Sequence, residues 1–114
     1  MILWKSLDSP SKLEEAIETS FQKDVVIFKH STSCSISHMA KLRLDESWDL
    51  EGVEAYYLDL KTYRALSDEI AEKFQVFHES PQVLLIRNGE CFYDASHLDI
   101  SVGEIKETLD WHVR

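Results

Sequence analysis

Two short, unbroken apolar runs constrain the fold of this chain more than any other feature of its sequence. Val25–Phe28 and Val83–Ile86 contain only aliphatic and aromatic residues. Such runs are typical of strands that are buried on both faces, and they are far too short to span a membrane. A chain of 114 residues with such strands must cover both faces of its sheet with helices. We expect residues 1–114 to form one domain.

The segments between these runs have the spacing of amphipathic helices and tight turns. Ser9-Pro10 supplies an N-cap and a proline at the first helical position. Ser101 and Glu104 form a capping box for a last helix, and Asn88-Gly89 is the residue pair of a two-residue hairpin turn. The positions predicted to face the core are Leu13, Ala16, Ile17 and Phe21 in the first helix, Ile36, Met39, Ala40 and Leu44 in the second, Leu66, Ile70 and Phe74 in the third, and Ile105, Leu109 and Val113 in the last.

The order of these segments defines the predicted architecture. With further strands predicted at residues 2–4, 53–58 and 91–93, the order is β-α-β-α-β-α-β-β-α. Strands that alternate with helices pair in parallel through right-handed crossovers, whereas the final hairpin is antiparallel. We therefore predict an α/β chain with a thioredoxin-like fold, in which helices flank both faces of a mixed sheet.

Charge and cysteine content exclude several classes of function. Twelve Lys and Arg against 21 Asp and Glu give a formal net charge of −9, which repels nucleic-acid phosphates, and no basic stripe is present to bind a membrane surface. Two cysteines are too few for a disulfide-stapled secreted domain, so we expect both thiols to be reduced in the cytoplasm. No Cys-x-x-Cys or His-x-x-x-His pair supports a metal site, and we predict no bound metal or cofactor.

Cys34 is the strongest candidate for a catalytic residue. It follows the strand at residues 25–28 by a short polar turn and stands where the next helix begins. The N–H groups of a first helical turn, and roughly half a positive charge from the helix dipole, stabilise a thiolate at that position. This context favours a reactive nucleophile over a buried structural cysteine. His30 and His38 could add positive charge when protonated.

The residue three positions beyond Cys34 is Ser37. A dithiol oxidoreductase has a second cysteine at this position, which resolves the mixed disulfide, and a serine cannot do so. We predict that the Ser37 hydroxyl donates a hydrogen bond to the Cys34 sulfur across one helical turn. The alternative is an ordinary residue of the first helical turn. The remaining chemistry is monothiol, which means attack on a disulfide followed by release through an external thiol.

Ser80-Pro81 directly precedes the second apolar run. A proline in this place suits a cis peptide bond, and a trans proline that starts an edge strand is the alternative. In a thioredoxin-like fold such a cis-proline faces the thiol, and the backbone of the preceding residue pairs with an extended substrate. We therefore predict that Ser80 and Pro81 contact the substrate.

Cys91 lies just after the Asn88-Gly89 turn. In the predicted fold this end of the sheet is remote from the catalytic loop, and a disulfide needs Cα atoms within about 7 Å of each other. We therefore interpret Cys91 as a structural cysteine. The alternative is a resolving thiol that pairs with Cys34.

Three segments together resemble the YtxJ family, which comprises monothiol bacilliredoxins of the thioredoxin superfamily. They are His30–Ser37 (HSTSCSIS), Glu79–Ile86 (ESPQVLLI) and Ala95–His97 (ASH), and they occur in the expected order. The resemblance covers nearly the whole chain. Ser35 departs from it, because the family usually has proline there. The Cys-Gly-Phe-Ser motif of monothiol glutaredoxins that bridge iron–sulfur clusters is absent.

The resemblance implies that Cys34 removes a low-molecular-weight thiol of the bacillithiol type from cysteines of client proteins. The partners would be S-thiolated client proteins and the small thiol as co-substrate, without nucleic acid or membrane. The residues implied to contact the substrate are Thr32, Ser37, Ser80, Pro81 and His97. Because the second cysteine is missing, an alternative stays open: a catalytically silent thioredoxin-like module that binds an extended client segment at Ser80-Pro81.

Overall fold

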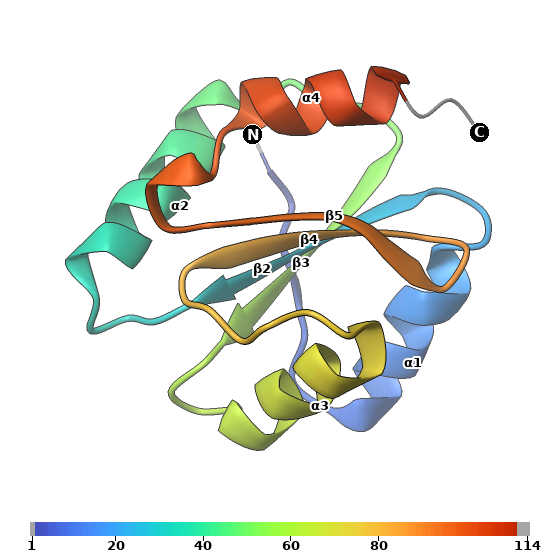
Figure 1. The fold of residues 1–114 in the computed structure, drawn as a ribbon, viewed down its shortest axis with the longest axis horizontal. Helices are drawn as coiled ribbons and strands as arrows, with labels where there is room; N and C mark the ends of the chain where they lie inside the picture. The colour runs from blue at the N-terminus through green and yellow to red at the C-terminus, as the bar shows by residue number, and fades with distance from the viewer. Residues whose placement is uncertain (1, 112–114) are drawn as a thin grey trace.

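Strands and helices alternate in the predicted order in the computed structural model, which describes residues 2–111 (Figure 1). The strands are β1 (Lys5–Ser6), β2 (Asp24–His30), β3 (Val53–Asp59), β4 (Gln82–Arg87) and β5 (Glu90–Ser96). The helices are α1 (Pro10–Thr19), α2 (Ser35–Ser47), α3 (Arg64–Phe74) and α4 (Val102–Trp111), with a short 3-10 helix, η1 (His97–Asp99), before α4. None of the helices described is long and apolar enough to cross a membrane.

The described strands form one mixed sheet in the order β1-β3-β2-β4-β5. β3 pairs in parallel with both β1 and β2, whereas β4 is antiparallel to β2 and β5. Helices α1 and α3 cover one face of the sheet, and α2 and α4 cover the other (Figure 1). This arrangement confirms the predicted α/β class and the helices on both faces.

The two central strands are buried on both faces, as their continuous apolar sequence predicts. Val25 and Ile27 of β2 belong to the core beneath α1 and α3, whereas Val26 and Phe28 belong to the core beneath α2 and α4. All four side chains have no exposed surface. Because side chains alternate along a strand, only a strand covered by helices on both faces buries every residue. β2 is therefore the rigid element from which the next loop leaves.

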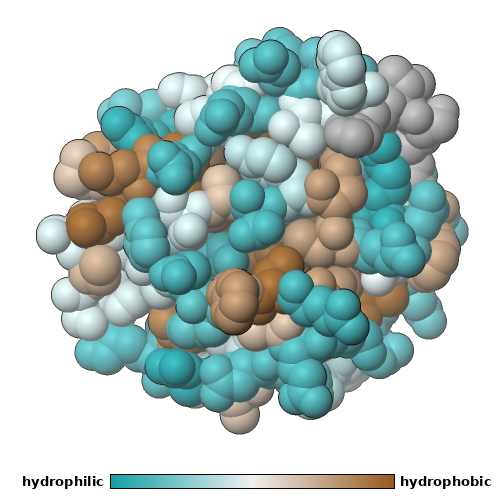
Figure 2. All heavy atoms as spheres, in the orientation of Figure 1, coloured by the Kyte–Doolittle hydropathy of each residue, from teal (hydrophilic) through white to brown (hydrophobic). Residues whose placement is uncertain are grey.

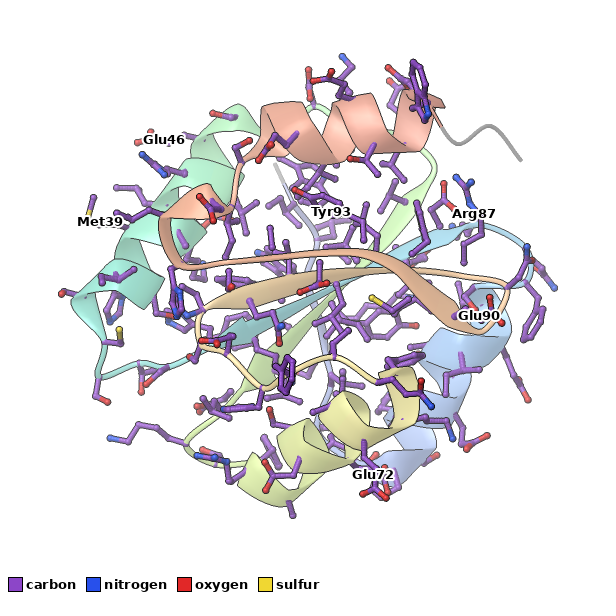
Figure 3. The ribbon with its side chains drawn as sticks, in the orientation of Figure 1. Met39, Glu46, Glu72, Arg87, Glu90 and Tyr93 are labelled. Carbon is purple, nitrogen blue, oxygen red and sulfur yellow. The ribbon has the colours of Figure 1, made fainter. Side chains whose placement is uncertain are left out.

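Several predicted core positions are wrong, and the geometry of the helices explains them. α1 ends at Thr19, so Phe21 lies beyond the helix and is 58% exposed. The buried face of α2 consists of Ser37, Ala40 and Leu44, which leaves Ile36 and Met39 40% and 52% exposed. Figure 3 shows Met39 pointing away from the sheet, and apolar side chains are visible on the surface over α2 in Figure 2.

The predicted ends of the elements are largely confirmed. The Ser9 hydroxyl accepts a hydrogen bond from the Lys12 N–H, and the Ser101 hydroxyl accepts one from the Glu104 N–H. Asn88-Gly89 forms the hairpin turn with positive φ angles of 52° and 78°. The first strand is Lys5–Ser6 instead of residues 2–4. The predicted core residue Val113 lies outside the described residues.

Candidate active site around Cys34

Cys34 is the N-cap residue of α2, as the sequence predicts. Its backbone is extended (φ −109°, ψ 122°), its N–H donates to the Ser31 carbonyl at 3.2 Å, and its carbonyl accepts from the His38 N–H at 3.1 Å. The side chain is half-buried, and no residue among 2–111 forms a hydrogen bond with its sulfur. Cys34 therefore stands at the N-terminal end of α2, where the N–H groups of a first helical turn lack helical partners and favour a negatively charged group.

The Ser37 hydroxyl does not have the predicted partner. It lies 2.6 Å from His30 Nδ1 and accepts a hydrogen bond from the Ser31 N–H at 3.0 Å. Ser37 has no exposed surface, so its side chain faces the core side of the loop. The predicted bond to the Cys34 sulfur is thus replaced by bonds to β2 and to the loop, because residue 37 falls on the buried face of α2.

Two histidines flank the loop that carries Cys34. His38 Nε2 lies 2.8 Å from the Thr32 carbonyl, which accepts its hydrogen, and the Thr32 side chain is exposed. The rings of His30 and His38 meet edge to face at 5.1 Å. Burial lowers the pKa of His30, and the neighbouring His38 and Lys41 lower it further. His30 is therefore neutral at neutral pH and does not supply the positive charge considered from the sequence.

The Ser80–Pro81 peptide bond is cis, as predicted. Pro81 is buried and directly precedes Gln82, which pairs with Lys29 near the end of β2. The cis-proline and the beginning of the Cys34 loop therefore lie at the same end of the sheet. The Ser80 hydroxyl is buried without a partner, and the Ser80 backbone N–H and C=O make no hydrogen bond with residues 2–111.

His97 lies beside the cis-proline. Its N–H donates to the Pro81 carbonyl at 2.9 Å, and its Nε2 is 3.1 Å from the Glu79 carboxylate. Its φ angle of 56° is in the left-handed region, which a non-glycine residue adopts only when its surroundings hold it there. Glu79 is not among the site residues predicted from the sequence, where its signal is its place at the start of the Glu79–Ile86 segment, next to Ser80-Pro81.

Cys91 lies at the other end of the sheet, as predicted. It pairs with Ile86, which pairs with Val25 at the beginning of β2, whereas Cys34 follows the end of β2 at His30. The Cys91 thiol donates to the Tyr93 carbonyl at 3.4 Å and packs against the core beneath α1 and α3. Burial raises the pKa of Cys91 to about 11. The residues described hold no cluster of three or more metal-ligating side chains.

Comparison with known proteins agrees with this fold. The family model for the monothiol bacilliredoxin BrxC matches residues 5–105. A solved structure described as an oxidoreductase with a thioredoxin fold is 36% identical, covers 90% of this chain and 89% of its own, and has a TM-score of 0.80.

Two thioredoxins share the fold at low identity. The thioredoxin of Malassezia sympodialis is 16% identical over 98% of this chain and 92% of its own, with a TM-score of 0.75. That of Fasciola hepatica is 18% identical over 96% and 99%, with a TM-score of 0.73.

The fold and these matches define a thiol redox protein of the thioredoxin class. Because the family model covers most of the sequence, the chain belongs to the monothiol bacilliredoxin family BrxC. The relationship inferred from the three sequence segments is confirmed.

Proposed function

We propose that this protein is a monothiol oxidoreductase that removes a low-molecular-weight thiol of the bacillithiol type from cysteines of client proteins. The observation that carries the proposal is the placement of Cys34 as the N-cap of α2, half-buried and with no partner for its sulfur among the described residues. Cys91 is at the opposite end of the sheet, and Ser37 stands where a dithiol enzyme has its second cysteine.

The first step is attack on the mixed disulfide of a client. The Cys34 thiolate attacks the sulfur of the small thiol, a new Cys34–small-thiol disulfide forms, and the client–small-thiol bond breaks. The client sulfur leaves as a thiolate and takes a proton from water. The N–H groups at the beginning of α2 stabilise the Cys34 thiolate before attack.

The second step regenerates the enzyme. A second molecule of the small thiol attacks as its thiolate, the Cys34 sulfur leaves as a thiolate, and the two small thiols are released as their disulfide. No second cysteine of the chain is needed. Because this step requires a reduced small thiol, we place the protein in the cytoplasm.

The client is held beside Cys34 by the loops at the same end of the sheet. The unpaired backbone N–H and C=O of Ser80 can pair with an extended client segment, as a strand pairs with a sheet edge. The exposed Thr32 and His97 lie on either side of these Ser80 backbone groups. Thr32 is in the Cys34 loop, and His97 is at the start of η1. The Pro81 carbonyl accepts a hydrogen bond from the His97 N–H and so connects the Ser80-Pro81 segment to the start of η1.

The test is turnover with a client peptide that carries the small thiol as a mixed disulfide. With excess reduced small thiol, the wild type and Cys91→Ser should release reduced peptide at equal rates, and Cys34→Ser should release none above background. Mass spectrometry should detect a small-thiol adduct on Cys34 alone. A wild type that binds the peptide without releasing the small thiol would instead establish the catalytically silent module. An internal Cys34–Cys91 disulfide would contradict the monothiol mechanism.

A further inference from the structure

A buried chain of three polar groups fastens the Cys34 loop to the sheet. His30 is the last residue of β2 and is 1% exposed, and Ser37 lies in the first turns of α2 with no exposed surface. The Ser37 hydroxyl bridges the His30 ring at 2.6 Å and the Ser31 N–H at 3.0 Å. These hydrogen bonds therefore connect the strand before the loop, the loop itself and the helix after it.

These two hydrogen bonds require a hydroxyl at position 37. Its oxygen accepts the Ser31 N–H while its hydrogen is directed to His30 Nδ1, which accepts when the imidazole is neutral and carries its hydrogen on Nε2. Burial and the neighbouring His38 and Lys41 lower the pKa of His30, whereas Asp59 raises it, and burial is the largest effect. The side chain of alanine provides neither donor nor acceptor, and it would leave the part-buried Ser31 N–H and the buried His30 Nδ1 without the Ser37 hydroxyl as a partner.

We propose that Ser37 and His30 are positioning residues that hold the loop of residues 31–34 against β2 and thereby keep the Cys34 sulfur at the first turn of α2. This inference rests on the proposed function, because it explains how the nucleophile is held. It also assigns a role to the residue at the position of the missing second cysteine. Ser37 acts through the loop and does not touch the substrate or the sulfur.

The molecule contains a matched control on the opposite face of the sheet. Ser67 of α3 also has no exposed surface, and its hydroxyl lies 3.3 Å from Nδ1 of another histidine, His78. Ser67→Ala therefore removes the same atom from the same kind of pair, but in α3, which covers the face of the sheet opposite to α2 (Figure 1).

The experiment measures the alkylation rate of Cys34 by iodoacetamide against pH, in a Cys91→Ser background that leaves a single thiol. The loss of one hydrogen bond corresponds to about a five-fold change in an equilibrium or rate constant. In Ser37→Ala, Cys34 should therefore be alkylated about five-fold more slowly at pH 6.5. The midpoint of the curve of alkylation rate against pH should move to higher pH. Ser67→Ala should keep the wild-type rate and midpoint. Urea unfolding of both variants separates lost stability from lost positioning.

A second pair of variants keeps the test decisive if Ser37→Ala does not fold. The amide of His30→Asn has a polar atom at the same distance from Cβ as Nδ1, so this variant should retain most of the wild-type rate. His30→Leu has no such atom and should match the expected loss in Ser37→Ala.

The outcomes separate the two proposals. Folded Ser37→Ala or His30→Leu with a wild-type profile would overturn the positioning role alone, as would an equal loss in Ser67→Ala. A wild-type Cys34 that alkylates no faster than a small free thiol would overturn the proposed function, and the positioning role with it.

Discussion

Cys34 lies where β2 gives way to α2, whereas Cys91 lies on β5 beside the hairpin turn at the other end of the sheet. Cys34 is surrounded by a polar loop and the N–H groups of a helix, and its sulfur has no partner within residues 2–111. Cys91 packs against apolar core residues and gives its hydrogen to the Tyr93 carbonyl. The two cysteines thus differ in their surroundings: burial disfavours a thiolate at Cys91, whereas Cys34 stands at a helix end among polar groups.

The difference extends to the way the two ends of the sheet are held. At the Cys34 end, the Ser37 hydroxyl bonds to His30 and to the Ser31 N–H, and the half-exposed Glu79 carboxylate contacts His97. At the Cys91 end, Arg87 of β4 donates hydrogen bonds of 2.7 and 3.0 Å to the carboxylate of Asp24 of β2. Figure 3 shows Arg87 at the end of the sheet opposite to the Cys34 loop. The ion pair is therefore confined to little-exposed side chains at the Cys91 end, whereas the Glu79–His97 contact at the Cys34 end is half-exposed.

The largest expected effect separates the two thiols by alkylation. At pH 7, a thiol with a pKa of about 11 has about 100-fold less thiolate than one with the ordinary pKa of 9.0. Iodoacetamide should therefore label Cys34 and leave Cys91 unmodified, as measured by mass spectrometry of digested protein. Cys34→Ser should take up no label on the same timescale, and Cys91→Ser should behave as the wild type. Labelling of Cys91 at a rate comparable to that of Cys34 would show that burial does not protect the Cys91 thiol.

The next effect concerns Lys29, which is fully buried on the face of the sheet that also holds Cys91. Its ammonium donates to the Ser67 carbonyl at 3.3 Å, and burial lowers its pKa from 10.5 to about 8. Between pH 8 and 10.5 the unfolded chain holds the extra proton, so this group makes stability rise with pH, by about 3 kcal/mol over the window. The raised pKa of Cys91 makes the native state hold the extra proton between pH 9 and 11, so stability falls there.

Urea unfolding from pH 7 to 10 should separate these opposing contributions. Lys29→Met should be more stable than the wild type at pH 7 by about 3 kcal/mol. Its free energy of unfolding should lack the increase that the wild type shows above pH 8. The free energy of unfolding of Cys91→Ala should keep increasing up to pH 10, because the opposing effect of the Cys91 thiol is removed. A Lys29→Met variant whose pH profile runs parallel to that of the wild type would show that the buried lysine has an ordinary pKa.

The smallest effect compares the Asp24–Arg87 ion pair with the Glu79–His97 contact at the other end of the sheet. Asp24→Asn should lower the free energy of unfolding by about 2 kcal/mol, because Asp24 and Arg87 are only 15% and 13% exposed and doubly bonded. Glu79→Gln should cost less than about 1 kcal/mol, since both partners of the pair with His97 are about half exposed. Thermal and urea unfolding measure both. A larger loss for Glu79→Gln than for Asp24→Asn would contradict this difference between the two ends.

Local patterns in the sequence predicted the features that depend on a few neighbouring residues. The continuous apolar run of β2 predicts burial on both faces, Asn88-Gly89 predicts a hairpin turn, and a cysteine after a polar turn predicts an N-cap thiol. Each of these depends on backbone geometry or on helix-end chemistry within one turn of chain. The family followed from short segments in a fixed order, because the motif residues are themselves local.

The tertiary structure alone decided where the side chains of these motifs point. Met39, which is predicted to face the core, is exposed and Ser37 is buried, because the packing of α2 on the sheet sets which face of the helix is buried. The partner of the Ser37 hydroxyl, the contact of His97 with Glu79 and the burial of Lys29 all depend on the register between distant strands and loops. The candidate nucleophile can therefore be predicted from the sequence, because a helix end creates its environment. The residues that hold the nucleophile cannot, because long-range packing creates theirs.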